Sequence, residues 1–315
     1  MTLISFIVPV YNRPREVDEL LESLSKQVYK DFEVIIVEDG SRLTCQDITD
    51  AWRSSMTIRY MMQENAGPGP ARNNGAEEAS GDWLVFLDSD VVLPASYTSI
   101  LAEKLPETSF DCFGGPDRPR ADFNATRKAI GHVMSSFLTT GGIRGGQEKM
   151  DKFYPRSFNL GIRNEVFQKI GGFSNMRYGE DLDLSMRLVE EGFQTELIRD
   201  AWVWHNRRNN FPSFFNQVFH SGEARIELEK RHPGTLKAVH TLPSLFTVGY
   251  PLLLVLAIFW YPLFIFVLLP PLIFFMDALF SLRHLKSSLL AAPAAFTQLF
   301  GYGTGFIHAW VKKSF

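Results

Sequence analysis

The stretch that decides the fold is Val85-Phe86-Leu87-Asp88-Ser89-Asp90, in which an apolar segment runs directly into two carboxylates. Alternate residues of an extended backbone point to the same side, so Asp88 and Asp90 can face one point. Two convergent carboxylates repel each other unless a cation lies between them, and Mg²⁺ or Mn²⁺ is typically held by carboxylates together with substrate phosphates. Open α/β sheets also bind ligands at the carboxyl ends of their strands. The stretch therefore indicates a site for a metal ion and a diphosphate.

The alternative interpretation of this stretch is a solvated turn whose carboxylates cap a helix. An Asp-x-Asp triplet is expected about once by chance in ~300 residues, and the chain holds a second one at Asp181-Leu182-Asp183. Spacing alone leaves both interpretations open, and the surrounding segments decide between them.

These segments predict a parallel α/β sheet. Residues 5–12 form a short apolar strand, residues 16–26 have apolar residues at helical spacing, and residues 32–37 form a second buried strand that ends in Glu38-Asp39-Gly40-Ser41. Strand, helix and strand in this order, with polar residues at the strand ends, are typical of such a sheet. Further on, Asn65–Gly75 is a glycine- and proline-punctuated turn that opens a helix, where backbone amides and Arg72 can approach an anion. Taken singly, each segment also fits an ordinary turn or loop.

Taken together and in this order, the segments resemble family-2 glycosyltransferases of the GT-A fold. The resemblance spans roughly residues 3–210 and implies an α/β fold class: a Rossmann-like nucleotide-diphospho-sugar transferase domain, here followed by a C-terminal helical transmembrane region. The matching segments are Val8–Asn12, Glu38–Ser41, Asn65–Gly67, Ala71–Asn73, Asp88–Asp90, Phe158–Arg163, Gly171–Phe173 and Gly179–Leu184.

The resemblance implies a nucleotide-sugar site at the strand ends. It places the Pro9, Tyr11 and Asp39 positions around the nucleotide base. It places the stretch from Asn65 to Arg72 beside the ribose and diphosphate. The nucleotide-sugar contacts expected from it are Pro9, Tyr11, Asn12, Asp39, Asn65, Gly67, Arg72, Asp88 and Ser89.

The resemblance also implies a metal site and a catalytic base. Asp90 is expected to be the more direct metal ligand, with Asp88 beside it. In related enzymes a His at the place of His205 can complete the site, and imidazole suits Mn²⁺ better than Mg²⁺. A lone His is also often a hydrogen-bonded core residue, and that alternative stays open. The expected cofactor is Mn²⁺ or Mg²⁺.

Glu180-Asp181 matches the family motif that carries the catalytic base. Asp181 lies at the start of a predicted helix over 182–191, where the helix dipole stabilises a carboxylate as the anion. That suits a group which must accept a proton from a sugar hydroxyl. Simple helix capping by Asp181 is the alternative. Asp183 is expected to face solvent or to support a loop.

Composition bounds the partners of the chain. A net charge of −3 argues against nucleic acid as an electrostatic partner. Only Cys45 and Cys112 are present, so neither a disulfide framework nor a cysteine metal site is indicated, and a reducing compartment fits. The first ten residues read as a strand rather than a signal peptide.

The C-terminal part predicts a membrane attachment. Residues 242–280 carry no charge before Asp277, which is enough apolar chain for two crossings of ~20 residues each. Basic residues flank this run on both sides and place both flanks in the cytoplasm. We therefore expect a catalytic domain over residues 1–235 and a membrane region over 236–315, with a hairpin of two transmembrane helices at about 243–280. Residues 289–311 form a third segment, interfacial or transmembrane, and the positive-inside bias slightly favours the former.

Two remaining stretches concern the acceptor. Thr139–Gly146 is too rich in glycine for a helix and is expected to be a mobile loop beside the site, or a plain surface linker. The Gln-x-x-Arg-Trp motif of processive family members is absent, which predicts addition of one or a few sugars. Arg207 and Arg208 follow instead, where they can meet the diphosphate or an anionic lipid head group, or form a basic face at the membrane surface.

The sequence thus predicts an inverting, metal-dependent glycosyltransferase on the cytoplasmic face of the cell (inner) membrane, with a multi-pass anchor. The expected donor is a nucleotide-diphosphate sugar, with a UDP-sugar favoured, and the expected acceptor is a hydroxyl of a lipid-linked or cell-envelope glycan. Two alternatives stay open: a polyprenyl-phosphate glycosyltransferase, and a catalytically inactive membrane scaffold with the same fold.

Overall fold

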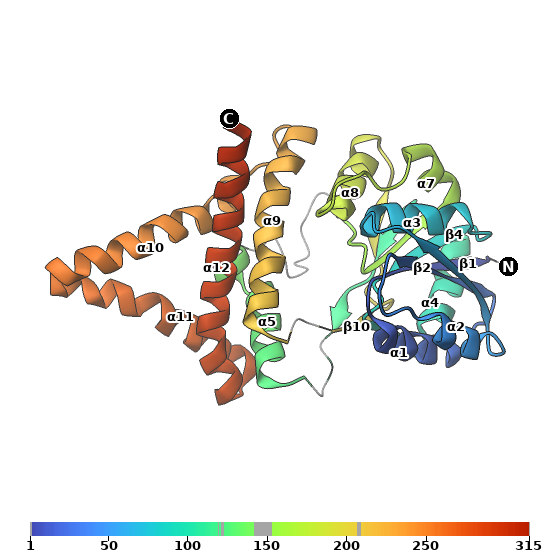
Figure 1. The fold of residues 1–315 in the computed structure, drawn as a ribbon, viewed down its shortest axis with the longest axis horizontal. Coiled ribbons are helices and arrows are strands. Elements are labelled where there is room, and N and C mark those ends of the chain that lie inside the picture. The colour runs from blue at the N-terminus through green and yellow to red at the C-terminus, as the bar shows by residue number, and fades with distance from the viewer. Residues whose placement is uncertain (1, 119, 121–122, 142–152, 207–208, 315) are drawn as a thin grey trace. The chain divides into compact units, whose positions relative to one another are not determined.

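The computed structural model describes residues 2–118, 120, 123–141, 153–206 and 209–314 (Figure 1). The chain divides into two compact units, residues 1–120 with 150–206 and residues 121–149 with 207–315. The compact units therefore divide the chain earlier than the predicted boundary at residue 235. The boundary at residue 235 separates the predicted catalytic domain from the predicted membrane region. It is a functional division, and it stays a prediction.

A seven-stranded sheet forms the centre of the first unit, in the order β3-β2-β1-β4-β8-β6-β9. The strands are β1 (Ile4–Val10), β2 (Phe32–Asp39), β3 (Thr57–Gln63), β4 (Trp83–Leu87), β6 (Cys112–Gly114), β8 (Asn159–Arg163) and β9 (Thr195–Leu197). Strand β1 pairs in parallel with β2 and β4, and β2 pairs in parallel with β3, as the strand-helix-strand pattern predicts. Strand β8 runs antiparallel to β4 and β6. The mixed α/β sheet of the predicted fold class is thus confirmed.

Helices cover both faces of this sheet, which explains why its central strands are buried throughout. The helices are α1 (Pro14–Ser25), α2 (Gln46–Trp52), α3 (Pro68–Glu77), α4 (Tyr97–Lys104), α7 (Asn164–Ile170) and α8 (Glu180–Glu190), with a 3₁₀ turn at Leu105–Glu107. Leu20 and Leu21 of α1 pack with Tyr97 of α4 in one core cluster. Ala71 of α3 and Leu184 of α8 belong to a second cluster on the other face.

A small three-stranded sheet, in the order β5-β10-β7, positions the segment after α8. Its strands are β5 (Val91–Val92), β7 (Asp117–Arg118) and β10 (Val203–His205). His205 pairs with Val91, the residue directly after Asp90. The backbone N–H of Asn206 also donates to the Asp90 carbonyl over 3.0 Å. This pairing brings a residue more than a hundred positions away beside the Asp88-Ser89-Asp90 turn.

The described part of the second unit is helical. Its helices are α5 (Ala125–Ser135), α6 (Phe137–Thr140), α9 (Phe211–Arg231), α10 (Leu242–Phe259), α11 (Phe264–Leu282) and α12 (Leu285–Ser314), with 3₁₀ turns at Ala238–His240 and Tyr261–Leu263. Helix α12 packs along α9 and also contacts α5, α10 and α11. Glycines allow the close approach of α9 and α12: a Cβ on Gly305 would lie 1.9 Å from the Phe219 carbonyl oxygen, and one on Gly222 would lie 2.2 Å from that of Tyr302.

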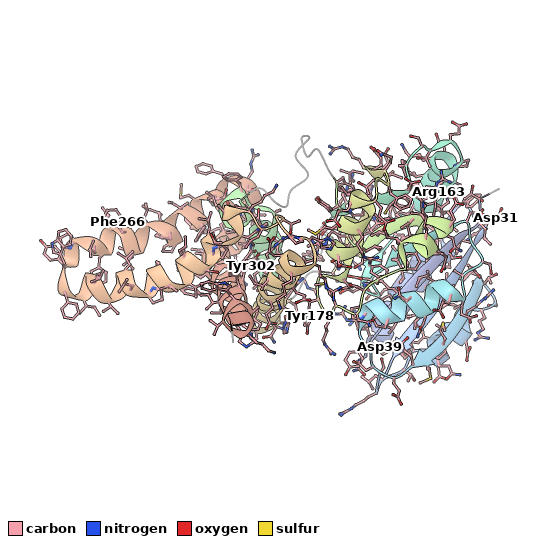
Figure 2. The ribbon with its side chains drawn as sticks, turned by 90° about the horizontal axis from the view of Figure 1, so that it is seen from above. Asp31, Asp39, Arg163, Tyr178, Phe266 and Tyr302 are labelled. Carbon is pink, nitrogen blue, oxygen red and sulfur yellow. The ribbon has the colours of Figure 1, made fainter. Side chains whose placement is uncertain are left out.

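Helices α10 and α11 form a hairpin that projects from the rest of this unit (Figures 1 and 2). Two segments, Leu242–Phe259 and Tyr261–Leu282, are long and apolar enough to cross a membrane, and only 6% and 17% of them is buried. A core helix of a soluble protein would be mostly buried, so these exposures favour a membrane environment. In the part of the chain that the structure describes, no other helix meets the same criterion. Membrane crossing itself stays a prediction.

The predicted loop over Thr139–Gly146 is wrong at its start. Thr139 and Thr140 belong to α6, because Ser136 caps that helix and accepts a hydrogen bond from the Leu138 N–H. The Thr140 hydroxyl donates back to the Ser136 carbonyl over 2.7 Å. Gly141 then ends the helix in the left-handed conformation, with φ of 61°. Residues 142–146 lie outside the described residues, as do Arg207 and Arg208.

Candidate functional site

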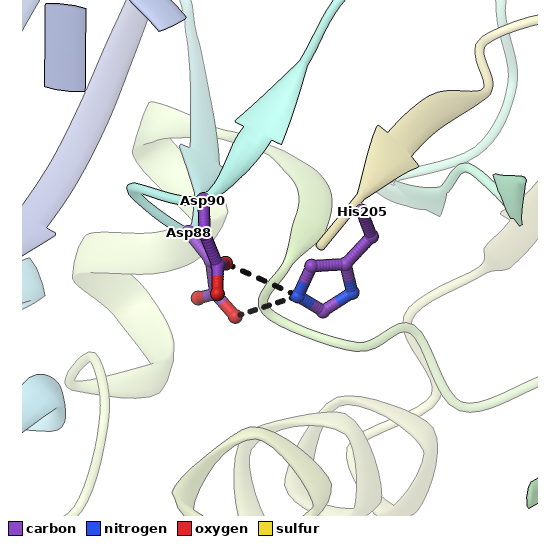
Figure 3. Close-up of side chains that lie close together, drawn as sticks. All are labelled: Asp88, Asp90 and His205. Carbon is purple, nitrogen blue, oxygen red and sulfur yellow. Dashed lines mark ion pairs between the residues drawn. The ribbon is translucent and has the colours of Figure 1, made fainter. Parts of the chain in front are cut away.

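Asp88, Asp90 and His205 converge at the end of β4 (Figure 3). The Nε2 atom of His205 lies 3.2 Å from Asp90 Oδ1 and 3.9 Å from Asp88 Oδ2. One ligand atom from each of the three residues lies within 4.8 Å of the others. The buried strand β4 and the pairing of β10 with β5 fix these positions. The structure therefore brings together the three residues predicted to hold a metal ion.

The donor set fits a divalent cation. Two carboxylates and an imidazole suit Mn²⁺ or Mg²⁺, and the nitrogen ligand favours Mn²⁺. The side chains of Asp90 and His205 are 11% and 19% exposed, whereas that of Asp88 is 34% exposed. The group is thus held on its inner side and open on its outer side, where substrate phosphates would complete the coordination of the ion.

Arg13 is a site residue that the sequence argument missed. Its guanidinium pairs with Asp90 Oδ2. Burial would raise the pKa of Asp90, but hydrogen bonds from His205 and Arg13 hold the pKa of that carboxyl well below its usual range. Arg13 lies just past the end of β1. In the sequence it marks only the end of an apolar run, and nothing there indicates a partner for it. Asp90 is therefore an anion with two cationic or donor partners.

Arg72 connects the metal-site residues to the Glu180-Asp181 motif. It is buried, its Nη2 lies 2.9 Å from Asp88 Oδ1, and its Nη1 lies 2.8 Å from Glu180 Oε1. Its guanidinium also lies over the Phe173 ring, 5.3 Å from the centroid. The contact of Arg72 with a diphosphate stays a prediction, and the structure gives this side chain a further role that spacing did not predict. It pairs with two carboxylates from distant segments and links them.

Helix α8 begins at Glu180, directly after Gly179 in the left-handed conformation with φ of 82°. Asp181 is 7% exposed, and its Oδ2 accepts a hydrogen bond from Arg156 Nε over 2.6 Å. Burial would raise the pKa of Asp181, but the Arg156 guanidinium lowers it below its ordinary value. For Glu180 burial prevails over the pairing with Arg72, and the pKa is raised. Arg156, like Arg13, had no signal in the sequence.

Two alternatives were predicted for Asp183, that it faces solvent or that it supports a loop, and the first of them is wrong. It is 1% exposed, and its Oδ2 accepts a hydrogen bond from Arg187 Nε over 3.0 Å. Arg187 in turn donates to the carbonyls of Ile170 and Gly172. Asp183 therefore supports the loop after α7, which is the second of the two predicted alternatives. Asp183 and Arg187 are four residues apart, so they lie on the same face of α8, about one helical turn apart.

The predicted nucleotide-contacting residues at β2 and α3 form one hydrogen-bonded turn. The Asp39 carboxylate accepts from the backbone N–H groups of Ala66 at 2.8 Å and Gly67 at 2.9 Å. Asn65 Nδ2 donates to the Asp39 carbonyl over 2.8 Å. Gly67, with φ of 98°, is the N-cap residue directly before α3. Figure 2 shows Asp39 at the carboxyl end of β2, opposite Asp31 at its start.

The predicted residues at the end of β1 form a second turn at the same edge. Pro9 is half-buried in β1, and Tyr11 is exposed. Asn12 has a positive φ of 54°, and its N–H donates to Ser41 Oγ over 2.7 Å. Ser89 is buried between Asp88 and Asp90. All predicted nucleotide-sugar residues therefore lie at the carboxyl edge of the parallel strands, and their contacts with a donor stay a prediction.

The sheet order, the turn after β4 and the Glu-Asp helix together define a GT-A fold. The sequence matches the model of glycosyl transferase family 2 over residues 5–171, about half of the chain. The protein therefore belongs to glycosyl transferase family 2.

The chain is similar to several known proteins. An uncharacterized glycosyltransferase of Haemophilus influenzae is 32% identical over 197 residues, which are 60% of this chain and 63% of that relative. Relatives from Rickettsia felis and Rickettsia conorii are matched over only 18% of their own length.

Among solved structures, the mannosyltransferase PcManGT from Pyrobaculum calidifontis, in complex with GDP-Man and Mn²⁺, has a TM-score of 0.68 at 15% identity, covering 94% of this chain and 87% of that one. TarS 1–349 of S. aureus, in complex with UDP-GlcNAc, has a TM-score of 0.54 at 17% identity, covering 99% and 92%. At these identities the two structures show a shared fold.

Proposed function

We propose that this protein is a metal-dependent, inverting glycosyltransferase that moves a sugar from a nucleotide-diphosphate sugar to a hydroxyl group. The observation that carries the proposal is the convergence of Asp88, Asp90 and His205 at the carboxyl edge of the sheet, with Arg72 linking Asp88 to Glu180, the neighbour of Asp181. Family membership supports the class of reaction. The nucleotide sugars in the PcManGT and TarS complexes support the class of donor, with Mn²⁺ in the former.

In this proposal the turns around Asp39 and Asn12 hold the nucleotide, and its diphosphate points toward Asp88 and Asp90. A divalent cation bound there would offset the negative charge that develops on the leaving diphosphate. Asp181 accepts the proton of an acceptor hydroxyl, whose oxygen attacks the anomeric carbon from the face opposite the diphosphate. The carbon–oxygen bond to the diphosphate breaks as the new glycosidic bond forms, so the anomeric configuration inverts. The ion pairs of Arg72 with Asp88 and Glu180 hold the metal-site residues and the Glu180-Asp181 motif in place relative to each other.

The pairing of Arg156 with Asp181 gives a pH prediction. Asp181 acts as a base only when ionised, so activity falls as the pH drops through its pKa. Arg156 lowers that pKa, whereas burial raises it. The substitution Arg156→Gln removes the lowering influence, and the acidic limb of the kcat/KM profile is expected to move to higher pH.

The measurement is a pH profile of both proteins under identical donor and metal conditions. Arg163→Gln is the matched control, because Arg163 donates to the carbonyls of Thr108 and Phe110 and contacts neither Asp181 nor Glu180 in the described structure. An acidic limb that stays in place in Arg156→Gln would remove Asp181 from the role of base.

The acceptor is proposed to be a lipid-linked or cell-envelope glycan, because the second unit carries the two apolar helices. A polyprenyl phosphate is the second candidate, supported by the same membrane-type hairpin. The two differ in chemistry, since a phosphate oxygen needs little deprotonation and would depend weakly on a base at Asp181. An inactive scaffold is disfavoured, because the four carboxylates of the site are present and each of them has an arginine partner.

The class of donor is tested by incubating the full-length protein with a panel of UDP- and GDP-sugars and measuring release of free nucleotide with and without Mn²⁺. We expect Mn²⁺-dependent release from at least one donor, even without acceptor, because water replaces the acceptor slowly. Release that is equally fast in excess chelator would contradict metal dependence. Absence of release and of nucleotide binding across the panel would favour the scaffold.

The packing of the second unit supports a topology with α9 and α12 on the same side of the membrane, which we propose is the cytoplasmic side. Helix α9 precedes the hairpin and α12 follows it, yet the two lie along each other. His308 of α12 contacts Glu223 of α9 over 2.8 Å. A helix paired along its length with the charged α9 fits an interfacial position better than a third crossing. An even number of crossings then leaves both helices on one side.

A reporter fused after residue 315 is therefore expected to be cytoplasmic. The matched control is the same reporter inserted after Trp260, at the turn between α10 and α11, which is expected on the opposite side of the membrane. A cytoplasmic signal from both fusions would mean that the hairpin does not cross. An external signal from the fusion after residue 315 would mean three crossings.

A further inference from the structure

A pocket of about 460 Å³ lies in the first unit between α1 and the strands β5 and β10. Its volume falls within the ~300–1,000 Å³ of small-molecule sites. The side chains that give it chemical character are Glu19 and Glu22 of α1, Lys26 directly after that helix, and the two tryptophans Trp202 and Trp204. None of these five belongs to the metal or nucleotide residues described above.

The pocket lies on the opposite face of the small sheet from the metal-site residues. Successive residues of a strand point to opposite faces, so Trp204 and His205 of β10 diverge. Trp204 pairs with Val92, which lines the pocket, whereas His205 pairs with Val91, which does not. Trp202 has the same parity as Trp204 and lines the pocket as well. In the stretch Trp202-Val203-Trp204-His205, the two tryptophans therefore line the pocket, whereas His205 belongs to the metal-site residues.

The two tryptophans form a fixed aromatic wall. Their rings meet edge to face, with centroids 4.7 Å apart at 86°. The guanidinium of Arg118 lies over the Trp202 ring at 4.2 Å from its centroid. Opposite them, the Leu93 N–H donates to Ser23 Oγ over 3.1 Å and ties the chain after β5 to α1. The pocket is therefore held on both sides and not merely a space between loops.

The polar rim of the pocket has balanced charge. Lys26 Nζ lies 2.5 Å from Glu22 Oε1, and Arg120 Nη1 lies 3.1 Å from Glu19 Oε2. These two cations are each matched by a carboxylate and Arg118 lies against the Trp202 ring, so Lys26 and Arg120 offer no unpaired positive charge to a phosphate or nucleic acid. The rim offers instead carboxylate oxygens, which accept hydrogen bonds from hydroxyl groups, and an ammonium that donates.

We infer that this pocket is a second carbohydrate-binding site that takes one or two neutral pyranose rings. A pyranose has an apolar face of C–H groups and an equatorial rim of hydroxyls, which match the Trp202–Trp204 wall and the Glu19, Glu22 and Lys26 rim respectively. The inference goes beyond the transfer reaction and needs neither the metal nor the base. A glycan held here is bound away from the reacting centre, which raises its effective concentration at the enzyme.

The test is a binding titration of full-length protein in detergent, without donor or metal. Maltotriose, chitotriose and mannotriose serve as neutral probes, read by tryptophan fluorescence and by saturation-transfer NMR. We expect at least one to bind, and Trp202→Leu to weaken its affinity about tenfold or more. Trp52→Leu is the matched control, since Trp52 is a partly buried tryptophan of α2 outside the pocket. The affinity of the Trp52→Leu variant for the same trisaccharide should equal that of the unsubstituted protein.

Two further measurements keep the inference falsifiable. Glu22→Gln removes a rim charge on the surface of α1, keeps the fold, and should weaken the same trisaccharide. UDP with Mn²⁺ should not displace the sugar, since the donor residues lie on the other face. The inference is overturned by absence of binding, by binding that Trp202→Leu and Glu22→Gln both leave unchanged, or by displacement with UDP. It is equally overturned if none of the sugars changes the tryptophan fluorescence and phosphatidylglycerol vesicles cause a change that Trp202→Leu abolishes, which would identify a membrane contact.

Discussion

Asp90→Ala is expected to abolish measurable sugar transfer while the protein stays folded. Asp90 is the carboxylate at which His205 and Arg13 both meet, and it is the less exposed member of the Asp88–Asp90 pair. In the proposed mechanism, its loss deprives the diphosphate of the cation that would offset its charge. Removal of one electrostatic contact of this kind costs about 10²–10³ in rate, and loss of the ion as well is expected to cost more. The measurements are turnover and the Mn²⁺ dependence of nucleotide binding, which should both disappear.

The control for this prediction is Asp31→Ala. Asp31 is an exposed aspartate directly before β2, at the opposite end of the strands (Figure 2), and its removal should leave turnover and metal dependence unchanged. Asp90→Asn is a second variant, because it keeps the size of the side chain and a hydrogen-bond acceptor for Arg13. Near-normal turnover of Asp90→Ala, with Mn²⁺ or Mg²⁺ still required, would show that the metal lies elsewhere.

Asp181→Asn is expected to lower kcat by about 10²–10⁴ with little change in donor affinity, which is the usual contribution of a general base. An asparagine occupies the same volume and still accepts a hydrogen bond from Arg156, so folding should survive. Burst and steady-state kinetics at saturating donor separate the rate of the chemical step from binding. The same experiment decides between acceptors, because a phosphate acceptor predicts a small effect.

Asp183→Asn is the control within the same helix. Asp183 is more deeply buried than Asp181 but pairs with Arg187, which holds the loop after α7. Its substitution is expected to lower Tm and to leave kcat per folded molecule nearly unchanged. If donor affinity falls in Asp181→Asn while turnover of bound substrate does not, Asp181 is a binding residue and the base is another group.

Much of the first unit could be predicted because its signals are local. The apolar strand ends, the helical spacing of residues 16–26 and the turn before α3 all reflect hydrogen bonding and burial within short segments. The helix at Thr139 and Thr140 was missed, because a single Ser136 cap outweighed the glycines that follow it. The compact units differ from the functional boundary predicted at residue 235, which stays a prediction, because they depend on long-range packing. Helix α9 is amphipathic and reads as part of a soluble domain, but its apolar side chains Phe214 and Val218 pack in one cluster with Leu299 of α12.

The carboxylates of the site were predictable, whereas their ion pairs with arginines were not. Acidic residues at strand ends follow from alternation along one strand, and Asp88 and Asp90 illustrate this. Arg13, Arg72 and Arg156 reach their partners over 77, 16 and 25 positions of sequence, respectively, through pairings that only the folded sheet creates. Long side chains have no periodic signature, since their reach depends on rotamers and on what neighbouring helices leave open. Arg13 nevertheless contributes to the lowered pKa of Asp90, and Arg156 lowers that of Asp181.

The central claim is that a divalent cation held by Asp88, Asp90 and His205 organises the donor site. It is tested most directly by anomalous diffraction at the manganese absorption edge, on crystals grown with UDP and Mn²⁺. The account predicts one strong peak within coordination distance of Asp90 and His205, bridging to the diphosphate of the nucleotide, and no such peak in Asp90→Ala. A nucleotide bound at the strand ends with no peak between these three residues, or with the peak at another place, would contradict it.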